Sequence, residues 1–493
     1  MMISSFLEYY RDNGRFISHQ IESFNDFIEN RLQQIIDDIG EVKIDLPTQE
    51  NLVIRFGKVM IGPPEIKESD GSTKTLIPME ARLRKLTYSS TLYIEMTPVF
   101  EDVEHETTFV NIGDFPVMVK SNLCPLAGLS KEDMVSAGED QHDMGGYFII
   151  NGVERVLILF EDIAPNRLIF QKKKGEINAR IDSKNRGYTQ RHVFERKEDG
   201  MIVARFANIT TTPIPVVALI KALGIESDKD MMEAIFKGGE PTENTLINLY
   251  MAEISGRDDA IEYIGKILKI AKKEQVVERV EHLLDNYLLP HLGQDALSRV
   301  LKARYLANVM AKMDLLYEGK INDDIDHYGN KRLRLAGDLL ESVLRSTILG
   351  RWGLVARLQY NYQKMIKRGR RLPSLQSIVI TGVLTKQIMR AMAVGDFANQ
   401  TGVSQRLERS NFIRALGHLR GVVSPLSATQ EHYEARELHA THWGRLCAVR
   451  TPEGQNIGLR KFLALGAQVT TSSDDDEKKK VLSALNGLGV NNE

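Results

Sequence analysis

A polar turn near the end of the chain carries the side chains best suited to chemistry. Residues 451–458 read Thr-Pro-Glu-Gly-Gln-Asn-Ile-Gly. Pro452 fixes its own φ and keeps the preceding residue out of the helical region, and the two glycines permit positive φ, so the segment should form a rigid corner. Such a corner presents one carboxylate, Glu453, beside the amides of Gln455 and Asn456, which can orient a polar ligand. An ordinary surface turn has the same composition, so both interpretations stay open on residue types alone.

Groups of residues that could bind a metal ion are few and incomplete. The dense acidic cluster at residues 474–477 is followed at once by three lysines, which is typical of a solvated linker. His439, His442 and Cys447 have a spacing that suits ligands, but zinc needs a fourth partner that the sequence does not offer. Residues 324–327 lack the glutamate and the spacing of a calcium loop. We therefore expect no metal ligand, no bound cofactor and no catalytic residue in this chain.

A basic stretch offers the clearest surface for phosphate groups. Residues 342–371 contain eight basic residues and no acidic one: Arg345, Arg351, Arg357, Lys364, Lys367, Arg368, Arg370 and Arg371. We expect this stretch to be helical and to bind nucleic-acid phosphates in a salt-dependent way, with Arg368, Arg370 and Arg371 as the best individual candidates. A basic cluster that contacts the carbonyls at a helix end is the alternative. Residues 225–262 are strongly acidic in contrast, which suits a protein with one nucleic-acid face and one solvent or partner face.

Length and composition describe a multidomain soluble protein. A chain of 493 residues should form two to four domains, and its 42% hydrophobic and 26% charged residues are ordinary for globular proteins. No apolar run reaches the length of a membrane span, and the N-terminus lacks the features of a signal peptide. Two cysteines do not suggest a disulfide framework. We expect an intracellular, cytoplasmic protein.

Periodicity places the elements that position these side chains. Apolar residues at spacings of three and four predict a helix over 17–39, and alternation predicts strands over 51–121. Asn151-Gly152 predicts a tight hairpin between 147–150 and 155–159, and no phosphate-binding glycine loop is present there. Helical stripes follow at 261–271 and 297–313.

The polar turn belongs to a longer motif that identifies a family. Residues 441–447 (Thr-His-Trp-Gly-Arg-Leu-Cys) followed by 451–459 resemble the fork region of the second-largest subunit of multisubunit RNA polymerases. The resemblance extends over residues 15–470. Further matching segments are residues 20–27, 81–88, 115–121, 145–158, 402–405, 417–420 and 435–439.

This resemblance implies an α+β multidomain fold. Mixed α/β protrusion and lobe domains are followed by a fork region. The expected boundaries are protrusion 1–164, lobe 165–337, a second part of the protrusion 338–397, fork 398–470 and a polar tail 471–493.

The resemblance also implies roles for residues of the fork. Gln405, Arg420 and Arg436 become candidates for contacts with nucleic-acid strands, and Glu453 and Asn456 match residues near the incoming nucleotide. Residues 421–429 match the fork loop, near the point where the duplex opens. His442 and Trp443 are expected to pack beneath the fork.

Two positions of the fork depart from the pattern of the family. Arg450 stands where relatives usually have a glutamate, and Arg460 where they have an apolar residue. Both add positive charge at the corner.

The catalytic groups of such a polymerase are expected on other chains. The resemblance assigns the magnesium ligands to the largest subunit and the active-site lysines to the part of the second-largest subunit beyond the fork. The chain thus resembles the N-terminal piece of that subunit, encoded separately in some archaea as the B-double-prime subunit. Expected partners are the C-terminal part, the largest subunit, other polymerase subunits, DNA and RNA. The alternative is a free-standing nucleic-acid-binding protein that uses residues 342–371.

Overall fold

The structure is a computed structural model, and its described residues form two compact units. Unit 1 combines the chain up to Asp162 with the chain from Leu333 onward, and unit 2 is Ile163–Arg332. The described residues are 16–46, 51–173, 175–206, 212–236, 242–270, 275–350, 353–367, 374–379, 382–397, 401–470 and 475–487. Both units contain helices and β-sheet, so the α+β fold class is confirmed.

Unit 1 opens with one continuous helical run. Its parts are α2 (Ser18–Asp26), the π-helical η1 (Phe27–Arg31) and α3 (Leu32–Ile39). The helix predicted over 17–39 is confirmed, and it ends where Gly40 takes a φ of 55°. The π-helical turn was not predicted from the sequence. The first residue of that turn, Phe27, is buried and stacks on Phe115 with ring centroids 5.5 Å apart.

An antiparallel sheet receives the apolar side of this run. Its strands are β1 (Glu41–Asp45), β2 (Asn51–Ile61), β5 (Ser89–Phe100), β6 (Val103–Glu104) and β7 (Thr108–Pro116), and a separate hairpin joins β3 (Glu65–Lys67) to β4 (Thr73–Thr75). Alternate residues of β2 are buried, namely Leu52, Ile54 and Phe56. This period of two gives the sheet one apolar face, as the alternation predicted.

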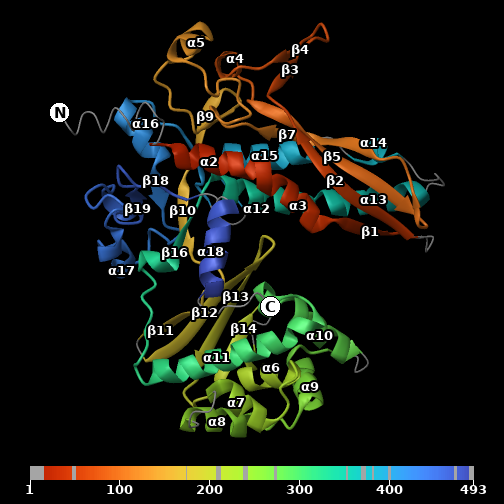
Figure 1. Cartoon of the computed structure of the whole chain (residues 1–493), viewed down its shortest axis with the longest axis vertical. Helices are drawn as coiled ribbons and strands as arrows, with labels where there is room; N and C mark the ends of the chain where they lie inside the picture. The colour runs from red at the N-terminus through yellow and green to blue at the C-terminus, as the bar shows by residue number, and fades with distance from the viewer. Residues whose placement is uncertain are drawn as a thin grey trace. The chain divides into compact units, whose positions relative to one another are not determined.

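Helices from much later in the chain complete the same core. They are α12 (Ala336–Leu349), α13 (Leu354–Lys367), α14 (Leu375–Ile378) and α15 (Val383–Val394). Figure 1 shows α13 and α15 beside the sheet, where α13 contacts β1 and α15 contacts β7. The helices expected over 338–371 are therefore confirmed for the described residues.

A tight hairpin leads from this core towards the C-terminal segment. The strands β8 (Phe148–Ile150) and β9 (Val153–Leu157) pair antiparallel, and their two turn residues, Asn151 and Gly152, have φ of 50° and 76°. Two successive positive φ values define the turn that Asn-Gly favours, so this prediction is confirmed. The other edge of β9 pairs with β17 (Ser404–Arg406), which sets Gln405 opposite Val156.

The C-terminal segment of unit 1 adds short elements to the hairpin. They are α16 (Phe412–Leu419), β18 (Gly421–Val423), α17 (Tyr433–Arg436), the 3₁₀ turns η6 (Ala440–His442) and η7 (Gly454–Asn456), and β19 (Arg460–Phe462). Strand β18 pairs in parallel with β10 (Leu159–Ile163) and antiparallel with β19. Sheet pairing thus joins residues near 160 to residues near 422 and 461.

One stretch predicted as strand is helical. Helix α4 (Pro78–Leu83) begins with proline at its first position, where the missing N–H costs no hydrogen bond. The one cation of this helix, Arg82, is engaged in ion pairs. Arg82 pairs with Glu139 at 2.8 Å and with Glu154 at 2.9 Å. Another short helix, α5 (Lys131–Ser136), follows later in unit 1.

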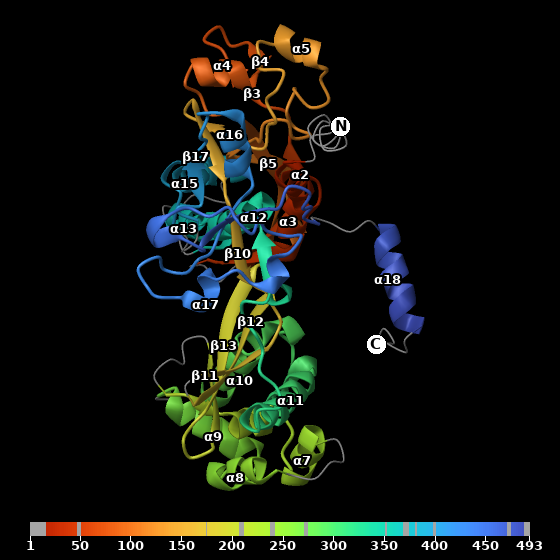
Figure 2. The ribbon, with the colours of Figure 1, turned by 90° about the vertical axis from the view of Figure 1, so that its left-hand side faces the viewer.

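Unit 2 packs helices against its own antiparallel sheet. The strands β11 (Ile169–Lys173), β12 (Glu176–Asn185), β13 (Tyr188–Arg196), β14 (Ile202–Phe206) and β15 (Ile214–Pro215) pair in sequence order. The helices are α6 (Val216–Ala222), α7 (Asp228–Phe236), α8 (Glu243–Ala252), α9 (Arg257–Ile267), α10 (Val276–Asn286) and α11 (Arg299–Tyr317). Helix α11 contacts α6, α7 and α8, whereas α9 packs against α6 and α10. Figure 2 shows α7 and α8 below α11.

The helical stripes predicted for unit 2 are only partly correct. Ile261 and Ile264 are buried on α9. The stripe predicted from 297 is wrong at its start, because α11 begins at Arg299 and both Leu297 and Leu301 are exposed.

The tail contains a helix that was not predicted for the solvated linker expected at 474–477, and its described side chains at 479–487 are exposed. Helix α18 (Asp475–Gly487) forms there. Among the described residues, no helix is long and apolar enough to cross a membrane.

Candidate nucleic-acid interface

The polar turn closes on itself through Thr451. The Thr451 hydroxyl donates to the carbonyl of Arg460 at 3.0 Å and accepts from the N–H of Gly458 at 2.9 Å. Both ends of the turn are therefore tied together, and Gly458 has a φ of 71°. Glu453 is exposed at the corner, and neither its carboxylate nor the Asn456 amide has a hydrogen-bond partner among the described residues. The corner expected from the sequence thus exposes Glu453, and Asn456 beside it is half-buried.

Arg436 fastens this turn to residues 428–430, at the end of the segment expected to be the fork loop. Its guanidinium donates to the carbonyls of Gln455 at 2.7 Å and Ile457 at 2.9 Å on one side. On the other side it donates to Ala428 at 3.0 Å and Gln430 at 3.2 Å. Gly458 packs so closely on Arg436 that an added Cβ would lie 2.3 Å from its carbonyl oxygen. Arg436 therefore positions two loops at once, and a strand contact by this residue stays a prediction.

The side chain of Arg420 is buried and links separate segments of unit 1. It is 4% exposed, at the end of α16, and its guanidinium donates to the carbonyl of Phe16. It also donates to Ala464 at 2.5 Å and Leu465 at 3.3 Å. Since these bonds engage the charge inside the protein, the predicted strand contact by Arg420 has no support from its geometry and stays a prediction.

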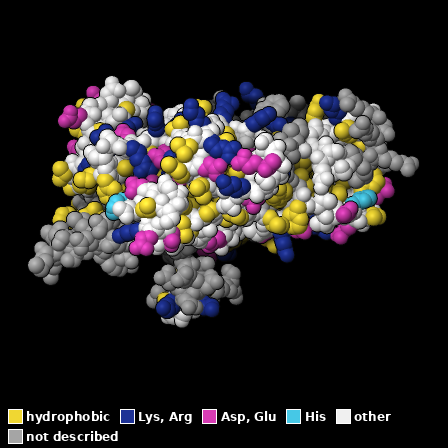
Figure 3. All heavy atoms as spheres, turned by 90° about the horizontal axis from the view of Figure 1, so that it is seen from above, with side chains coloured by type: hydrophobic (Ala, Val, Ile, Leu, Met, Phe, Trp, Pro, Cys, Tyr) yellow, Lys and Arg dark blue, Asp and Glu magenta, His cyan; other side chains and the backbone are white. Residues whose placement is uncertain are grey.

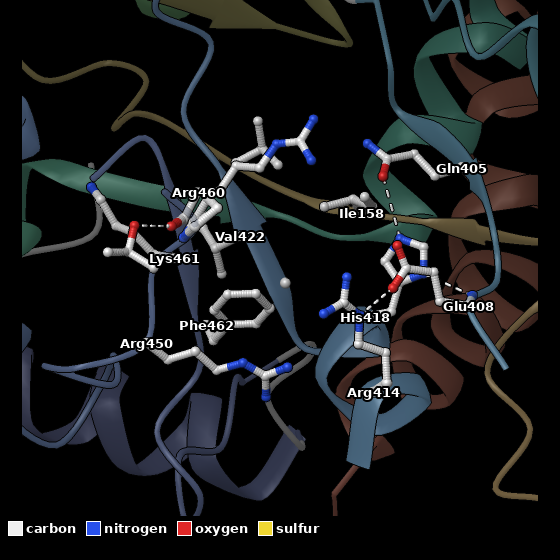
Figure 4. Close-up of a pocket in the computed structure, with 14 residues that line it drawn as sticks. Ile158, Gln405, Glu408, Arg414, His418, Val422, Arg450, Arg460, Lys461 and Phe462 are labelled. Carbon is white, nitrogen blue, oxygen red and sulfur yellow. Dashed lines mark hydrogen bonds and ion pairs between the residues drawn. The ribbon is translucent and has the colours of Figure 1, made fainter. Parts of the chain in front are cut away.

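Gln405 lies at a small pocket of about 240 Å³. The pocket is lined by Ile158; by Gln405, Glu408, Arg414 and His418; by Gly421–Val423; and by Arg450–Pro452 with Arg460–Phe462. The Gln405 amide donates to Gly402 at 3.0 Å, and its oxygen lies 3.3 Å from Nε2 of His418 (Figure 4). The structure thus brings Gln405 beside the start of the polar turn.

Cations dominate this pocket. Arg414 is paired with Glu408, the one carboxylate of the lining, and this pairing lowers the pKa of Glu408. Arg450 lies 4.1 Å from the centre of the Phe462 ring, in a cation–π contact. Arg460 is exposed and has no ion pair among the described residues. Among the described residues, the guanidiniums of Arg450 and Arg460 therefore have no carboxylate partner in the pocket, and these are the two fork positions at which the sequence was expected to depart from the family pattern.

The positive charge around this pocket affects the pKa of the His418 imidazole. Burial lowers its pKa, and the carboxylate of Glu408 opposes that shift. The guanidiniums of Arg460 and Arg414 lower it further, since a second cation is unfavourable beside them. The pocket thus favours a neutral histidine and an anionic ligand.

Arg414 and His418 were not predicted as site residues, although a signal was present. Asn411 caps α16 by accepting the N–H of Arg414 at 2.7 Å, as asparagine before an apolar helix predicts. Residues four apart then share one face of α16. The sequence of this helix therefore places Arg414 and His418 on one face. It does not show that this face lies against residues 450–462.

Arg409 fixes the approach to α16 and was also missed. It pairs with Asp143 at 2.8 Å and Glu154 at 2.7 Å, and it lies 5.1 Å from the centre of the Tyr147 ring. Burial alone would raise the pKa of Asp143, but the charge of Arg409 and the N–H of Gly145 hold it below its usual value. Arg409 therefore anchors the segment before α16 to the hairpin region.

The predicted basic stretch is only partly described. Arg351, Arg368, Arg370 and Arg371 lie outside the described residues. Arg345 pairs with Asp38 at 2.8 Å and with Glu341 at 2.9 Å, so its charge is balanced inside unit 1. Figure 3 shows Lys and Arg side chains interspersed with Asp and Glu on one face of the molecule. The sign of the surface charge alone does not mark an interface there.

The candidate metal ligands serve other purposes. Within the part of the chain that is described, no group of three His, Cys, Asp or Glu could hold a metal ion. Asp326 pairs with Lys331 at 2.9 Å. The rings of His439 and His442 lie 6.1 Å apart, and Nδ1 of His439 contacts the Thr441 hydroxyl at 2.6 Å. The side chains of Asp326 and His439 therefore make local contacts within their own turns.

The expected packing of Trp443 is wrong, while that of His442 is not contradicted. His442 is buried, but Trp443 is 88% exposed. The η6 turn directs the two neighbouring side chains in different directions, so only one of them reaches the core of this chain.

The fold and the fork motifs define a polymerase subunit, and comparison with known proteins shows which one. The model of the family described as RNA polymerase beta subunit matches residues 15–392, and the model of RNA polymerase Rpb2, domain 3, matches residues 405–469. The chain belongs to the family of second-largest subunits of DNA-directed RNA polymerase, and it corresponds to their N-terminal part.

Archaeal relatives resemble it over nearly its whole length. It is 42% identical to DNA-directed RNA polymerase subunit Rpo2N of Methanocaldococcus jannaschii, over 98% of each chain. It is 41% identical to subunit Rpo2N of Methanococcus vannielii, over 94% of each chain. It is also 41% identical to subunit Rpo2 of Saccharolobus solfataricus, where the match spans 96% of this chain but 42% of the relative.

Proposed function

We propose that the C-terminal segment of unit 1 contacts the nucleic acid during RNA synthesis by the assembled polymerase. In this proposal, residues 398–470 are the fork, residues 1–164 and 338–397 the protrusion, and residues 165–337 the lobe. The observation that carries it is the cationic pocket around Arg450 and Arg460, which adjoins the polar turn.

The chemistry of this pocket suits a strand backbone. Guanidiniums form charge-assisted hydrogen bonds with phosphate oxygens, and the two that lack a carboxylate partner are available for this. The Gln405 amide at the other side of the pocket offers a donor and an acceptor for a sugar or a base edge. Such contacts hold a strand without reading its sequence.

Glu453 and Asn456 are proposed to lie near the incoming nucleotide. Both side chains are presented from a corner that Thr451 and Arg436 hold rigid. A preorganised acceptor and amide can orient ribose hydroxyl groups at little entropic cost. Gln405 and Arg436 remain candidates for strand contacts, with Arg436 acting mainly through the loops that it positions. For Arg420 we propose the same kind of positioning role, and the contribution of Arg368, Arg370 and Arg371 remains a proposal from sequence.

The catalytic groups are proposed to come from partner chains. Nucleotidyl transfer uses two magnesium ions, and the described residues offer no carboxylate cluster that fits them. We assign these ions to the largest subunit and the active-site lysines to the C-terminal part of the second-largest subunit, in the cytoplasm. The described residues of this chain supply positioning and charge.

Reconstitution tests this division of labour. The purified chain should incorporate no nucleotide, and activity should appear when the remaining polymerase subunits are added. Incorporation by the chain alone, with contaminating polymerase excluded by immunodepletion, would contradict the proposal. The same experiment separates it from a free-standing nucleic-acid-binding protein, which would not co-purify with large polymerase subunits.

Crosslinking tests the position of the pocket. A photoreactive amino acid at Gln405 in the assembled enzyme should crosslink to a nucleic-acid strand of an elongation complex. The same amino acid at Tyr250, which is exposed on α8 of unit 2, serves as the control. Equal crosslinking at the two positions would count against an interface at Gln405.

A further inference from the structure

Helix α8 of unit 2 exposes apolar side chains while it buries polar ones. Thr245 and Asn248 are 0% and 1% exposed, whereas Tyr250 is 86% exposed and Leu246 is 48% exposed. Residues four apart share one face of a helix, so Leu246 and Tyr250 are neighbours on the surface. Met251, next to Tyr250, is 40% exposed. We call Leu246, Tyr250 and Met251 the α8 patch. Burial of apolar area by itself would favour the opposite orientation of the helix.

The buried polar side chains hold α8 in this orientation. The Asn248 amide donates to the carbonyl of Gly200 at 2.9 Å and accepts the N–H of Ile202 at 2.6 Å. The Thr245 hydroxyl donates to the Asp314 carboxylate at 2.8 Å. Rotation of α8 about its axis would leave these buried groups unpaired, which is costly. The α8 patch is therefore a preformed surface of unit 2.

Carboxylates border the α8 patch. Glu243 lies one turn before Leu246, and Glu253 ends the helix three residues after Tyr250. Both are exposed, and neither has an ion pair among the described residues. The helix itself contains no lysine or arginine. Figures 1 and 2 show α7 beside α8, and α7 contains three carboxylates and one lysine. The apolar side chains of the patch thus lie in negatively charged surroundings.

This combination favours one kind of occupant. Carboxylates repel the phosphates of nucleic acid, and they also repel the same face of a second copy of the chain. A permanent subunit interface buries a large area whose centre is depleted of charge, whereas the α8 patch is small and bordered by charge. A short amphipathic helix with a basic polar face complements both the apolar side chains and the carboxylates.

We propose that the α8 patch binds a basic amphipathic helix of a protein that is not a subunit of the polymerase. Apolar side chains of that helix pack on Leu246 and Tyr250, and its lysines or arginines pair with Glu243 and Glu253. Tyrosine is a frequent anchor in such interfaces, because its ring supplies a large contact area with few rotatable bonds. The proposal concerns unit 2 alone, so it does not depend on the nucleic-acid contacts proposed for residues 398–470.

A designed peptide tests the chemistry of this surface. The probe is a fluorescein-labelled amphipathic helix with leucine on one face and lysine on the other. Its control has glutamate at every lysine position. Fluorescence anisotropy is measured with the full chain and with the assembled polymerase. Both should bind the lysine peptide at least about tenfold more tightly than the glutamate peptide, and added salt should reduce this difference.

Variants of the full chain locate the binding site. Tyr250→Ser should weaken binding of the lysine peptide at least about tenfold, because it removes the aromatic anchor. Leu297→Ser changes a similarly exposed side chain of unit 2, at 88%, and should leave the affinity unchanged. Glu243→Gln should weaken binding and lower its salt dependence, whereas Glu132→Gln removes an exposed carboxylate of unit 1 and should do neither. All four side chains are exposed, so folding should persist, and circular dichroism checks this.

Four results would overturn the proposal. Unaltered binding by Tyr250→Ser would place the peptide elsewhere on the chain. Equal binding of the two peptides would show that the carboxylates do not select the occupant. Binding by the free chain but not by the assembled polymerase would show that a polymerase subunit covers the α8 patch. Self-association of the free chain that Tyr250→Ser abolishes would assign the patch to a second copy.

Discussion

Lys461 and Glu161 form a buried ion pair between strands 300 residues apart in the sequence. The Lys461 ammonium lies 3.2 Å and 3.1 Å from the two carboxylate oxygens of Glu161, and the side chains are 8% and 3% exposed. Lys461 is on β19 and Glu161 on β10, with β18 between them, so the pair spans the middle strand. This pair ties the segment that carries the candidate interface to the earlier part of unit 1.

Removing one partner of this pair should be costly. Glu161→Gln removes the carboxylate that faces the buried Lys461 ammonium, and we expect the free energy of unfolding of the chain to fall by about 3–5 kcal/mol. Urea denaturation followed by circular dichroism measures the change. Glu262→Gln breaks an exposed ion pair with Lys266 and should cost less than about 1 kcal/mol. Equal effects of the two variants would show that the buried pair has no special role.

Arg436→Ala should weaken the fork more than it weakens the assembly of the enzyme. The variant leaves four backbone carbonyls without their shared donor and frees the polar turn from the fork loop. Hydrogen bonds from a charged donor contribute about 1.5–3 kcal/mol, so the lifetime of open promoter complexes should shorten at least about tenfold. Lifetimes are measured with a DNA competitor. Arg445→Ala is the control, because the Arg445 guanidinium donates to the carbonyl of Thr441 within its own turn and does not join two loops. A normal lifetime for Arg436→Ala would contradict the role of Arg436 in holding the two loops.

Local signals predicted local structure well. Asn151-Gly152 predicted the hairpin because that dipeptide accepts two positive φ values, and the apolar spacing over 17–39 predicted a helix that ends at Gly40. The ordered motifs of residues 441–459 predicted the family, since a long match of specific residues does not depend on knowing the fold.

Contacts between distant residues could not be predicted in the same way. Gln20 donates to the carbonyls of Leu157 at 3.1 Å and Leu419 at 3.2 Å, and no periodicity in the sequence signals such a junction. For the same reason the sequence did not show that Arg420, whose charge suggested a strand contact, donates to carbonyls inside the protein. The exposure of Trp443 was missed because a tryptophan is usually buried within its own chain, and only the fold shows which apolar side chains lack cover.

Acid should destabilise unit 2 through His192. Burial lowers the pKa of its imidazole to about 4, so the ring is neutral in the folded protein. Its Nδ1 lies 3.1 Å from the carbonyl of Gln190, and Nε2 accepts the N–H of Leu289 at 3.0 Å, which fits the neutral ring. The unfolded chain binds the proton near pH 6.5, so stability is complete above that pH and falls until about pH 4.

The size of this effect can be measured against an exposed histidine. The loss from His192 between pH 7 and pH 4 should reach at most about 3 kcal/mol, and His192→Gln should flatten the dependence of the urea midpoint on pH while lowering stability at pH 7. His142→Gln changes an exposed ring and should leave the slope unchanged. A slope that persists in His192→Gln would show that other groups cause the acid sensitivity.

Arg460 should make a measurable contribution to the salt dependence of nucleic-acid binding. The guanidinium lies at the candidate pocket without an ion pair among the described residues, so a phosphate contact there would release about one counter-ion. Arg460→Ala in the assembled enzyme should therefore reduce the slope of log affinity against log salt by about one unit, equally for different sequences. Filter binding or fluorescence anisotropy of a preformed DNA–RNA scaffold at several salt concentrations measures the slope. Lys266→Ala, an exposed cation of unit 2, is the matched control for lost charge. If the two variants change the slope equally, the effect is one of net charge, and the pocket does not hold a phosphate.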